Sequence, residues 1–186
     1  MTLKEMKQKV LKLIEEYSGT AAGMTGDPDI SAKLNDVINQ IMFELARIKK
    51  IPKYIELDVT EGELVDFSAL EAAVGYEIYQ INLVGGVRFA PRANGTVLKF
   101  LESGKAEIDV YVYPERITSA TKDSYEFELT PDVLELMPFG VAADLLKSDV
   151  SADYGSVYAN RYESMLQRLD TRNAIFSAYI EGGLGL

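Results

Sequence analysis

The sequence predicts an α+β protein: a helical bundle of two amino-terminal and two carboxy-terminal helices, with an antiparallel β lobe inserted between the two pairs. Three observations support this prediction. Apolar residues recur every three or four positions up to Lys50, alternate with polar residues from Tyr54 onward, and return to helical spacing after Thr130. With 186 residues, of which 47% are hydrophobic, the chain is long enough to bury a core without disulfides.

Residues 1–53 are predicted to form a pair of amphipathic helices. The first helix ends near Ser18. Asp27 is placed to cap the second helix, and Pro28 fits its first turn, where a missing N–H costs nothing. The glycine-rich loop 19–26 lacks the Lys-Ser/Thr pair of a phosphate-binding P-loop. The predicted buried stripes are Leu3, Met6, Val10, Leu13, Ile14 and Tyr17, then Ile30, Leu34, Val37, Ile38, Ile41, Met42, Leu45 and Ile48.

Residues 54–124 are predicted to form the inserted β lobe. Turn-forming pairs, Gly85-Gly86 and Asn94-Gly95, separate its strands, and residues 96–101 form a further strand. Residues 65–73 read as a short connection with a helical turn. Strands in this order predict a β-meander, folded as a small sandwich or a curled sheet. The apolar residues that alternate along the strands are Ile55, Leu57 and Val59, then Tyr79, Ile81 and Leu83, then Ile108, Val110 and Val112.

Residues 125–172 are predicted to form a short strand, 125–129, followed by the second helical pair. Thr130 is expected at the N-cap and Pro131 at the first helical position, and Pro138 is expected to kink this helix. The two helical pairs should pack together because each apolar stripe needs an apolar partner. The stripes are Val133, Leu134, Leu136, Met137, Val141, Ala142, Leu145 and Leu146, then Tyr154, Val157, Tyr158, Tyr162, Met165, Leu166 and Leu169.

Residues 173–186 have two open interpretations. The first is a last helical turn that folds on its own domain. The second is an arm that docks on a neighbouring subunit, where a handful of buried apolar side chains contributes several kcal/mol in total, at about 1.5–3 kcal/mol each. The candidate docking residues are Ile175, Phe176, Tyr179, Ile180, Leu184 and Leu186.

The composition excludes several kinds of catalysis. The chain has no cysteine and no histidine, so thiol nucleophiles, Ser-His-Asp machinery and ordinary zinc sites are excluded. Carboxylates occur close together at Glu61 and Glu63, and at Asp123, Glu126 and Glu128, but an acidic chain produces such groups by chance. We therefore predict no catalytic, cofactor-binding or metal-binding residues, and a protein that is not an enzyme.

The net charge of -10 is unevenly distributed. Residues 1–53 carry nine Lys/Arg against seven Asp/Glu, so the acidic excess lies in the rest of the chain. Tight nucleic-acid binding needs clustered cations that neutralise phosphates, which makes this chain a poor candidate for it. An acidic surface suits a channel that lets DNA pass without sticking, and it also suits plain solubility. Neither a signal peptide nor a transmembrane helix is expected.

Three passages resemble a known family. These are FELTPDVLELMPFGVAADLLKSDVSADYGSVYANRYESMLQRL, the preceding VYVYPERIT, and DPDISAKLNDVINQIMFELARI near the amino terminus. Together they resemble the head-tail connector (adaptor) proteins of tailed bacteriophages, over most of residues 27–169. The resemblance implies a helical bundle with an inserted β-rich lobe. It also implies assembly into a ring, commonly of twelve subunits, below the portal.

The resemblance further implies a set of partners and a location. The partners are other copies of the chain, the portal protein, a downstream tail or stopper protein, and DNA that passes through without sequence-specific binding. The implied location is the virion of a phage or prophage, with assembly in the host bacterial cytoplasm. Neither a cofactor nor a membrane is expected. The β insertion and the apolar tail vary in this family, so subunit contacts do not transfer residue by residue.

We therefore expect a structural connector that extends the DNA channel and docks tail components. The alternative is a non-enzymatic soluble binding module whose β lobe recognises a small molecule or a carbohydrate. That alternative requires a concave pocket with a few convergent polar groups.

Overall fold

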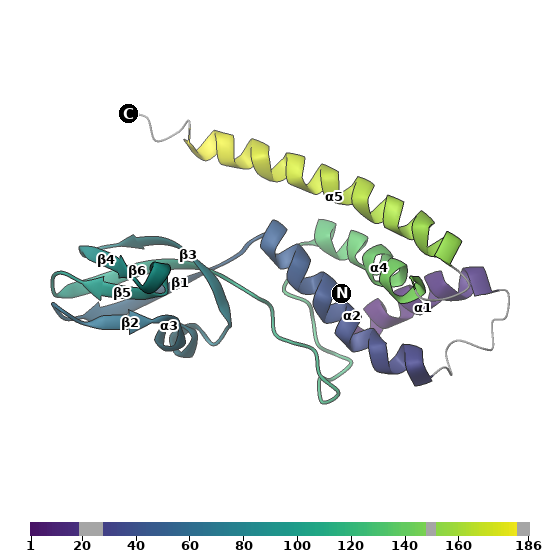
Figure 1. Ribbon diagram of the computed structural model, residues 1–186, viewed down its shortest axis with the longest axis horizontal. Helices are drawn as coiled ribbons and strands as arrows, with labels where there is room; N and C mark the ends of the chain where they lie inside the picture. The colour runs from purple at the N-terminus through teal and green to yellow at the C-terminus, as the bar shows by residue number, and fades with distance from the viewer. Residues whose placement is uncertain (19–27, 148–151, 182–186) are drawn as a thin grey trace. The chain divides into compact units, whose positions relative to one another are not determined.

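The computed structural model describes residues 1–18, 28–147 and 152–181. The chain divides into two compact units (Figure 1). The helical unit comprises Met1–Lys49 and Arg116–Leu186, and the β unit comprises Lys50–Glu115. The fold class is α+β, as predicted, with the β elements inserted between two sets of helices. Among the described residues, no helix combines the length and apolarity needed to cross a membrane.

The helical unit is built from α1 (Leu3–Ser18), α2 (Pro28–Ile48), α4 (Pro131–Leu146) and α5 (Ala152–Glu181). Helix α4 contacts each of the other three helices, so the amino-terminal helices pack with the carboxy-terminal ones as predicted (Figure 1). Ten residues of α4 are buried, which explains why its sequence is apolar on nearly every side. Residues buried in the other three helices include Leu3, Met6, Val10, Ile14, Leu34, Ile38, Ile41, Met42, Leu45, Tyr158, Tyr162 and Leu169.

Two glycines allow the helices around α4 to approach closely. A Cβ at Gly140 would lie 2.8 Å from the ring of Tyr162 in α5, and one at Gly155 would lie 3.2 Å from Leu146. The hydroxyl of Tyr162 donates to Glu44 Oε1 of α2 at 3.2 Å, and burial raises the pKa of this tyrosine. These contacts place the α4-facing side of α5 at Gly155 and Tyr162. Val157, predicted to be buried, is instead 50% exposed because it points away from that side.

Helix α4 begins at Pro131, the predicted position. Thr130 is the N-cap with an extended backbone, although its side chain makes no capping hydrogen bond. The helix continues through Pro138 to Leu146, so the internal proline does not end it. Pro138 is buried, and burial of the surrounding apolar stripe outweighs the lost hydrogen bond.

The segment between the β unit and α4 covers the start of α1. The predicted strand 125–129 is wrong: among the described residues this stretch forms a single β-bridge, Thr2 with Glu126. The start of α1 donates hydrogen bonds to this part of the chain: the N–H of Leu3 donates to Tyr125 O at 2.8 Å, and the N–H of Lys4 donates to Asp123 O, just before the stretch, at 3.1 Å. The free N–H groups of a helix start need such acceptors, which is why the stretch pairs with a helix end and not with a strand.

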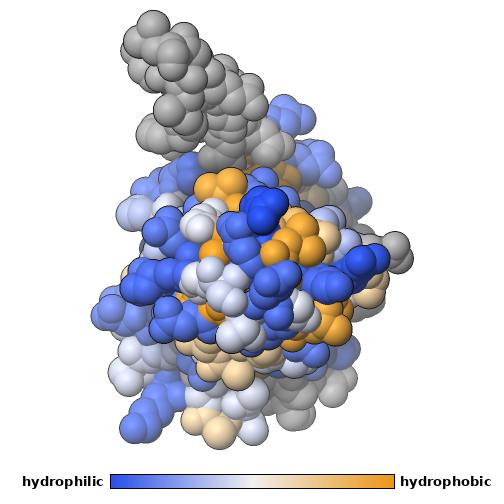
Figure 2. All heavy atoms as spheres, turned by 90° about the vertical axis from the view of Figure 1, so that its left-hand side faces the viewer, coloured by the Kyte–Doolittle hydropathy of each residue, from blue (hydrophilic) through white to orange (hydrophobic). Residues whose placement is uncertain are grey.

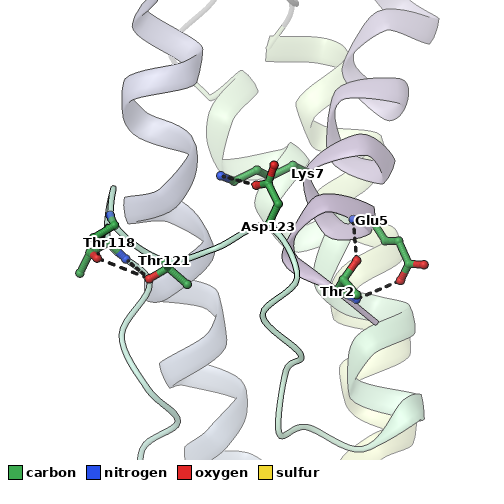
Figure 3. Close-up of polar contacts among 7 residues, drawn as sticks. Thr2, Glu5, Lys7, Thr118, Thr121 and Asp123 are labelled. Carbon is green, nitrogen blue, oxygen red and sulfur yellow. Dashed lines mark hydrogen bonds and ion pairs between the residues drawn. The ribbon is translucent and has the colours of Figure 1, made fainter.

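Side chains complete the cap of α1 (Figure 3). The backbone N–H of Thr2 donates to Glu5 Oε2 at 2.9 Å, and the N–H of Glu5 donates to Thr2 Oγ1 at 3.2 Å. This reciprocal pair is a capping box. Lys7 lies 4.0 Å from Asp123, and the N–H of Thr118 donates to Thr121 Oγ1 at 2.9 Å in the same segment (Figure 3).

The β unit contains two three-stranded antiparallel sheets. One has the order β1-β6-β3, formed by Ile51–Val59, Gly104–Val112 and Ile78–Gly85. The other has the order β2-β5-β4, formed by Leu64–Asp66, Val97–Phe100 and Phe89–Arg92. The predicted β-meander is therefore wrong, because β1 pairs with β6 along Ile51↔Val112 to Val59↔Gly104 and not with its neighbour in sequence.

A single core joins the two sheets. Val65, Leu98 and Phe100 from one sheet cluster with residues of β1, β3 and β6 from the other. The ambiguous stretch 65–73 is resolved into the end of β2 and helix α3 (Phe67–Val74), whose Leu70 is fully buried in this core. Asp66 caps α3 by accepting from the N–H of Ala69 at 2.9 Å.

Candidate functional site

The docking residues predicted at the carboxy terminus lie at or beyond the end of α5. Helix α5 extends to Glu181, so the backbone of Ile175, Phe176, Tyr179 and Ile180 is helical. Their side chains, and the whole of Leu184 and Leu186, lie outside the described residues, as does the loop 19–26. Their role in subunit docking stays a prediction.

Two of the carboxylates noted in the sequence, Glu63 and Asp123, have local structural partners. Glu63 accepts hydrogen bonds from the N–H and the hydroxyl of Thr60 at 2.8 and 3.1 Å, which fixes the turn between β1 and β2. Asp123 faces Lys7 at the start of α1. Within residues 1–18, 28–147 and 152–181, no group of three or more Asp or Glu side chains is arranged to hold a metal ion. The contacts of Glu63 and Asp123 are local ones, within a turn and at a helix start.

The outward side of sheet β1-β6-β3 carries a concentrated set of exposed acidic groups. Residues directly opposite each other on antiparallel strands share one face. The register therefore places Tyr54, Asp109 and Leu83 in one row across the sheet and Glu56 and Glu107 in the next. Asp58 and Lys105 form a third row. We call these residues the acidic sheet face: Tyr54, Glu56, Asp58, Leu83, Lys105, Glu107 and Asp109.

Two carboxylates of this face oppose each other directly. Glu56 and Glu107 are Cα partners in the β1-β6 ladder, an arrangement of like charges that destabilises a strand pair. Lys105 relieves part of the repulsion through an ion pair with Glu56 at 2.6 Å. In the part of the chain that the structure describes, no ion pair involves Glu107 or Asp109. The face therefore retains unpaired negative charge.

Two large side chains stand among these carboxylates. Tyr54 is 56% exposed and Leu83 is 59% exposed. Partial burial raises the pKa of Tyr54, and the nearby Glu107 and Glu56 raise it further. Figure 2 shows separate groups of apolar spheres among hydrophilic ones on the face that it views. Exposed apolar groups of this kind, rimmed by charge, are typical of protein contact surfaces.

Leu83 reaches this face through a β-bulge. The alternation of Tyr79, Ile81 and Leu83 predicts that all three share the buried side. The β3-β6 pairing is irregular between Ile81 and Leu83, where Ile81 is opposite Val110 and Leu83 is opposite Asp109. One extra residue in a strand turns the following side chains to the other face. The sequence-based placement of Leu83 is therefore wrong.

A groove lies against α1 and α4 on the helical unit. It has a volume of about 320 Å³ and is lined by Lys9, Lys12, Leu13, Glu135, Pro138 and Phe139, which we call the lysine groove. The guanidinium of Arg161 lies 4.3 Å from the centre of the Phe139 ring, which places a further cation beside it. Tyr158 of α5 supports the floor: its hydroxyl donates to Leu13 O at 2.6 Å. The groove is apolar at its base and predominantly cationic at its rim.

The sequence indicates that some residues of these two surfaces point outward, but it does not indicate which of them are neighbours. Alternation along the strands indicates that Glu56 and Glu107 point outward, but it does not show that they are neighbours. Helical periodicity likewise indicates that Lys9 and Lys12 lie off the buried stripe of α1, but it does not show that Phe139 lies next to them. Residues 51 to 130 positions apart in the chain come together only in the fold.

Comparison with protein-family models and with curated proteins finds no match for this chain.

Proposed function

We propose that this protein is a structural head-tail connector of a phage or prophage particle, which forms a ring below the portal, extends the DNA channel and docks tail components. The observation that carries the proposal is the architecture. Helices α1 and α2 pack with the carboxy-terminal helices in one unit, and the β insertion between them in sequence forms a second unit. This is the arrangement that the resemblance of residues 27–169 to connector proteins implies.

The character of the described surface supports a role in assembly. The acidic sheet face and the lysine groove present charged and apolar side chains suited to protein contacts. Among the carboxylates noted in the sequence, Glu63 accepts local hydrogen bonds and Asp123 faces Lys7. A net charge of -10 also disfavours tight DNA binding, as a channel component requires.

The decisive experiment is assembly with the portal. The purified chain should form rings, alone or on portal rings, which sedimentation velocity and negative-stain electron microscopy would detect. Portal and capsid genes upstream and tail genes downstream would give independent support. A chain that stays monomeric at high concentration and does not bind portal rings would overturn the proposal.

The exposure of Tyr54 and Leu83 also supports the second candidate, a non-enzymatic binding module that uses the β unit. Aromatic and apolar side chains beside carboxylates suit the stacking and hydrogen bonding of a sugar or another polar small molecule. Titration of the labelled chain with a carbohydrate panel would distinguish the candidates. Saturable NMR shifts at Tyr54 and Leu83 in a chain that never assembles would favour the binding module.

A further inference from the structure

The helical unit and the β unit carry surfaces of opposite charge. The acidic sheet face has four carboxylates and one lysine. Helix α1 carries four lysines and three glutamates. The remainder of the chain holds 15 Lys/Arg (19 minus 4) and 26 Asp/Glu (29 minus 3), so α1 is cationic in a chain that is otherwise acidic.

We propose that the acidic sheet face of one copy docks on the lysine groove of a second copy. In this contact, Lys9 and Lys12 meet the carboxylates of Glu107 and Asp109. Tyr54 and Leu83 pack against the apolar floor formed by Leu13 and Phe139. The inference rests on the proposed function, since it specifies how connector subunits would contact one another.

Charge complementarity selects a second copy as the occupant. In a chain of net charge -10, two copies repel each other unless an opposite patch is available, and α1 provides one. The apolar parts also correspond, because each surface combines an apolar centre with a charged rim. The contact joins two different patches, so it is heterologous, and a heterologous contact that closes on itself generates a ring.

The proposal also accounts for the pairing of Glu56 with Glu107. Opposed like charges weaken the β1-β6 ladder in an isolated chain, and Lys105 pairs with only one of the two. Cations from a neighbouring α1 would relieve the remaining repulsion. The self-association should therefore weaken as the salt concentration rises, because salt screens exposed charges.

Charge reversal on each side tests the contact. One variant carries Lys9→Glu with Lys12→Glu, and the other carries Glu107→Lys with Asp109→Lys. Each alone should weaken self-association more than about tenfold, because like charges then face each other across the interface. The assay is sedimentation velocity of the full chain, alone and on portal rings, with a thermal melt of each variant. If the lysine-substituted sheet variant fails to fold, Glu107→Gln with Asp109→Asn replaces it.

Recombination of the two changes is the sharper test. An equimolar mixture of the two variants should assemble again, because every mixed contact is complementary while each contact between identical copies is repulsive. A single chain carrying all four substitutions should also assemble. The matched control is Glu61→Lys with Glu77→Lys, which makes the same change in charge on the β unit outside the acidic sheet face and should assemble like the unmodified chain.

The alternatives give different results. If the unmodified chain assembles and both reversal variants assemble equally well, the inference is overturned while the proposed function stands. If only the sheet variant loses portal binding, the occupant is another protein and the inference is overturned. If the variants change thermal stability but not assembly, the two surfaces meet within one chain, which also overturns it. If the unmodified chain never assembles, the proposed function and the inference fail together.

Discussion

At the residue scale, Asn39 connects the helical unit to the chain that returns from the β unit. It lies in α2, is 3% exposed, and makes two hydrogen bonds with Ile117, itself 2% exposed. Asn39 Nδ2 donates to Ile117 O and the N–H of Ile117 donates to Asn39 Oδ1, both at 2.8 Å. A side-chain amide can satisfy a backbone donor and acceptor together, as a neighbouring strand would.

Replacing Asn39 should therefore destabilise the protein. In Asn39→Leu, the N–H and the carbonyl of Ile117 lose their partners while buried, at a cost of about 2–4 kcal/mol in unfolding free energy. Urea denaturation monitored by circular dichroism would measure this. The neighbouring exposed Gln40 provides the control, because Gln40→Ala should change the unfolding free energy by less than about 0.5 kcal/mol. Equal midpoints for the two variants would contradict the assigned role of Asn39.

Gly86 provides a second prediction at this scale. Its φ angle is +78°, and an added Cβ would overlap the carbonyl oxygen of Lys105 in β6. Gly75, at the end of α3, has the same φ but nothing within 4 Å of the added atom. Gly75→Ala should cost about 1–2 kcal/mol from the backbone conformation alone. Gly86→Ala should cost a further 1–3 kcal/mol or so from the overlap, and equal thermal midpoints would refute this account.

At the scale of elements, the helix starts follow from short-range sequence patterns. Pro28 and Pro131 begin α2 and α4 as predicted, because the fixed φ of proline and its missing N–H suit the first turn of a helix. Strand β4 is not among the predicted strands, and it contains Pro91. It is an edge strand of its sheet, the position where a missing N–H donor is tolerated. A pattern of single residues does not show which strand will be at an edge.

The capping box of α1 predicts a pH dependence. The hydrogen bond from the N–H of Thr2 lowers the pKa of Glu5 below its usual 4.5. Desolvation opposes this shift, and the charge of the amino terminus adds to it. The unfolded chain therefore takes up this proton first as the pH falls. The stabilisation from Glu5 is complete above about pH 4.5 and disappears as the pH drops through the lower folded pKa.

Comparison of the unmodified chain with Glu5→Gln would test this. The unmodified protein should have the higher unfolding free energy at neutral pH, because its charge also interacts favourably with the helix start. The difference should shrink on acidification below about pH 4.5. NMR titration of the Glu5 side chain provides a direct measure of its pKa. Stability curves that stay parallel from neutral to acidic pH would show that Glu5 does not act in this way.

At the scale of the whole molecule, the β unit has its own core. Its buried residues come from β1, β2, α3, β3, β5 and β6, and Phe100 and Ile108 are fully buried. The chain enters and leaves at neighbouring positions, since Ile51 is the Cα partner of Val112. A segment with a closed core and adjacent ends has the features of an independent domain.

We therefore expect the fragment Lys50–Glu115 to fold in isolation. It should give dispersed amide resonances and a cooperative thermal transition, at modest stability because small domains bury less of their surface. Phe100→Ala in the same fragment is the matched control and should unfold it, since loss of a buried phenylalanine costs about 3–5 kcal/mol. A random-coil spectrum for the unmodified fragment would contradict its independence.

The sequence by itself determined the features that depend on neighbours a few positions apart. These are the bounds of α1, α2 and α4, the buried stripes to which Leu3 and Leu34 belong, and the change from helices to strands and back. Each is decided by the 3.6- or 2-residue repeat of one element, together with a cap or a proline at its end. This is also why the α+β class and the packing of the two helical sets were predictable.

Only the tertiary structure decided which distant residues became neighbours. Many strand orders satisfy the same alternation, and the choice of β1-β6-β3 depends on closing a core around Phe100 and Leu70. That choice places Glu56 beside Glu107, and a bulge in β3 turns Leu83 outward to join them. The bonds between Asn39 and Ile117 have the same origin. Contacts of this kind depend on the free energy of packing the core and on the entropy cost of closing the loops between distant residues. The local repeat of apolar residues does not encode that balance.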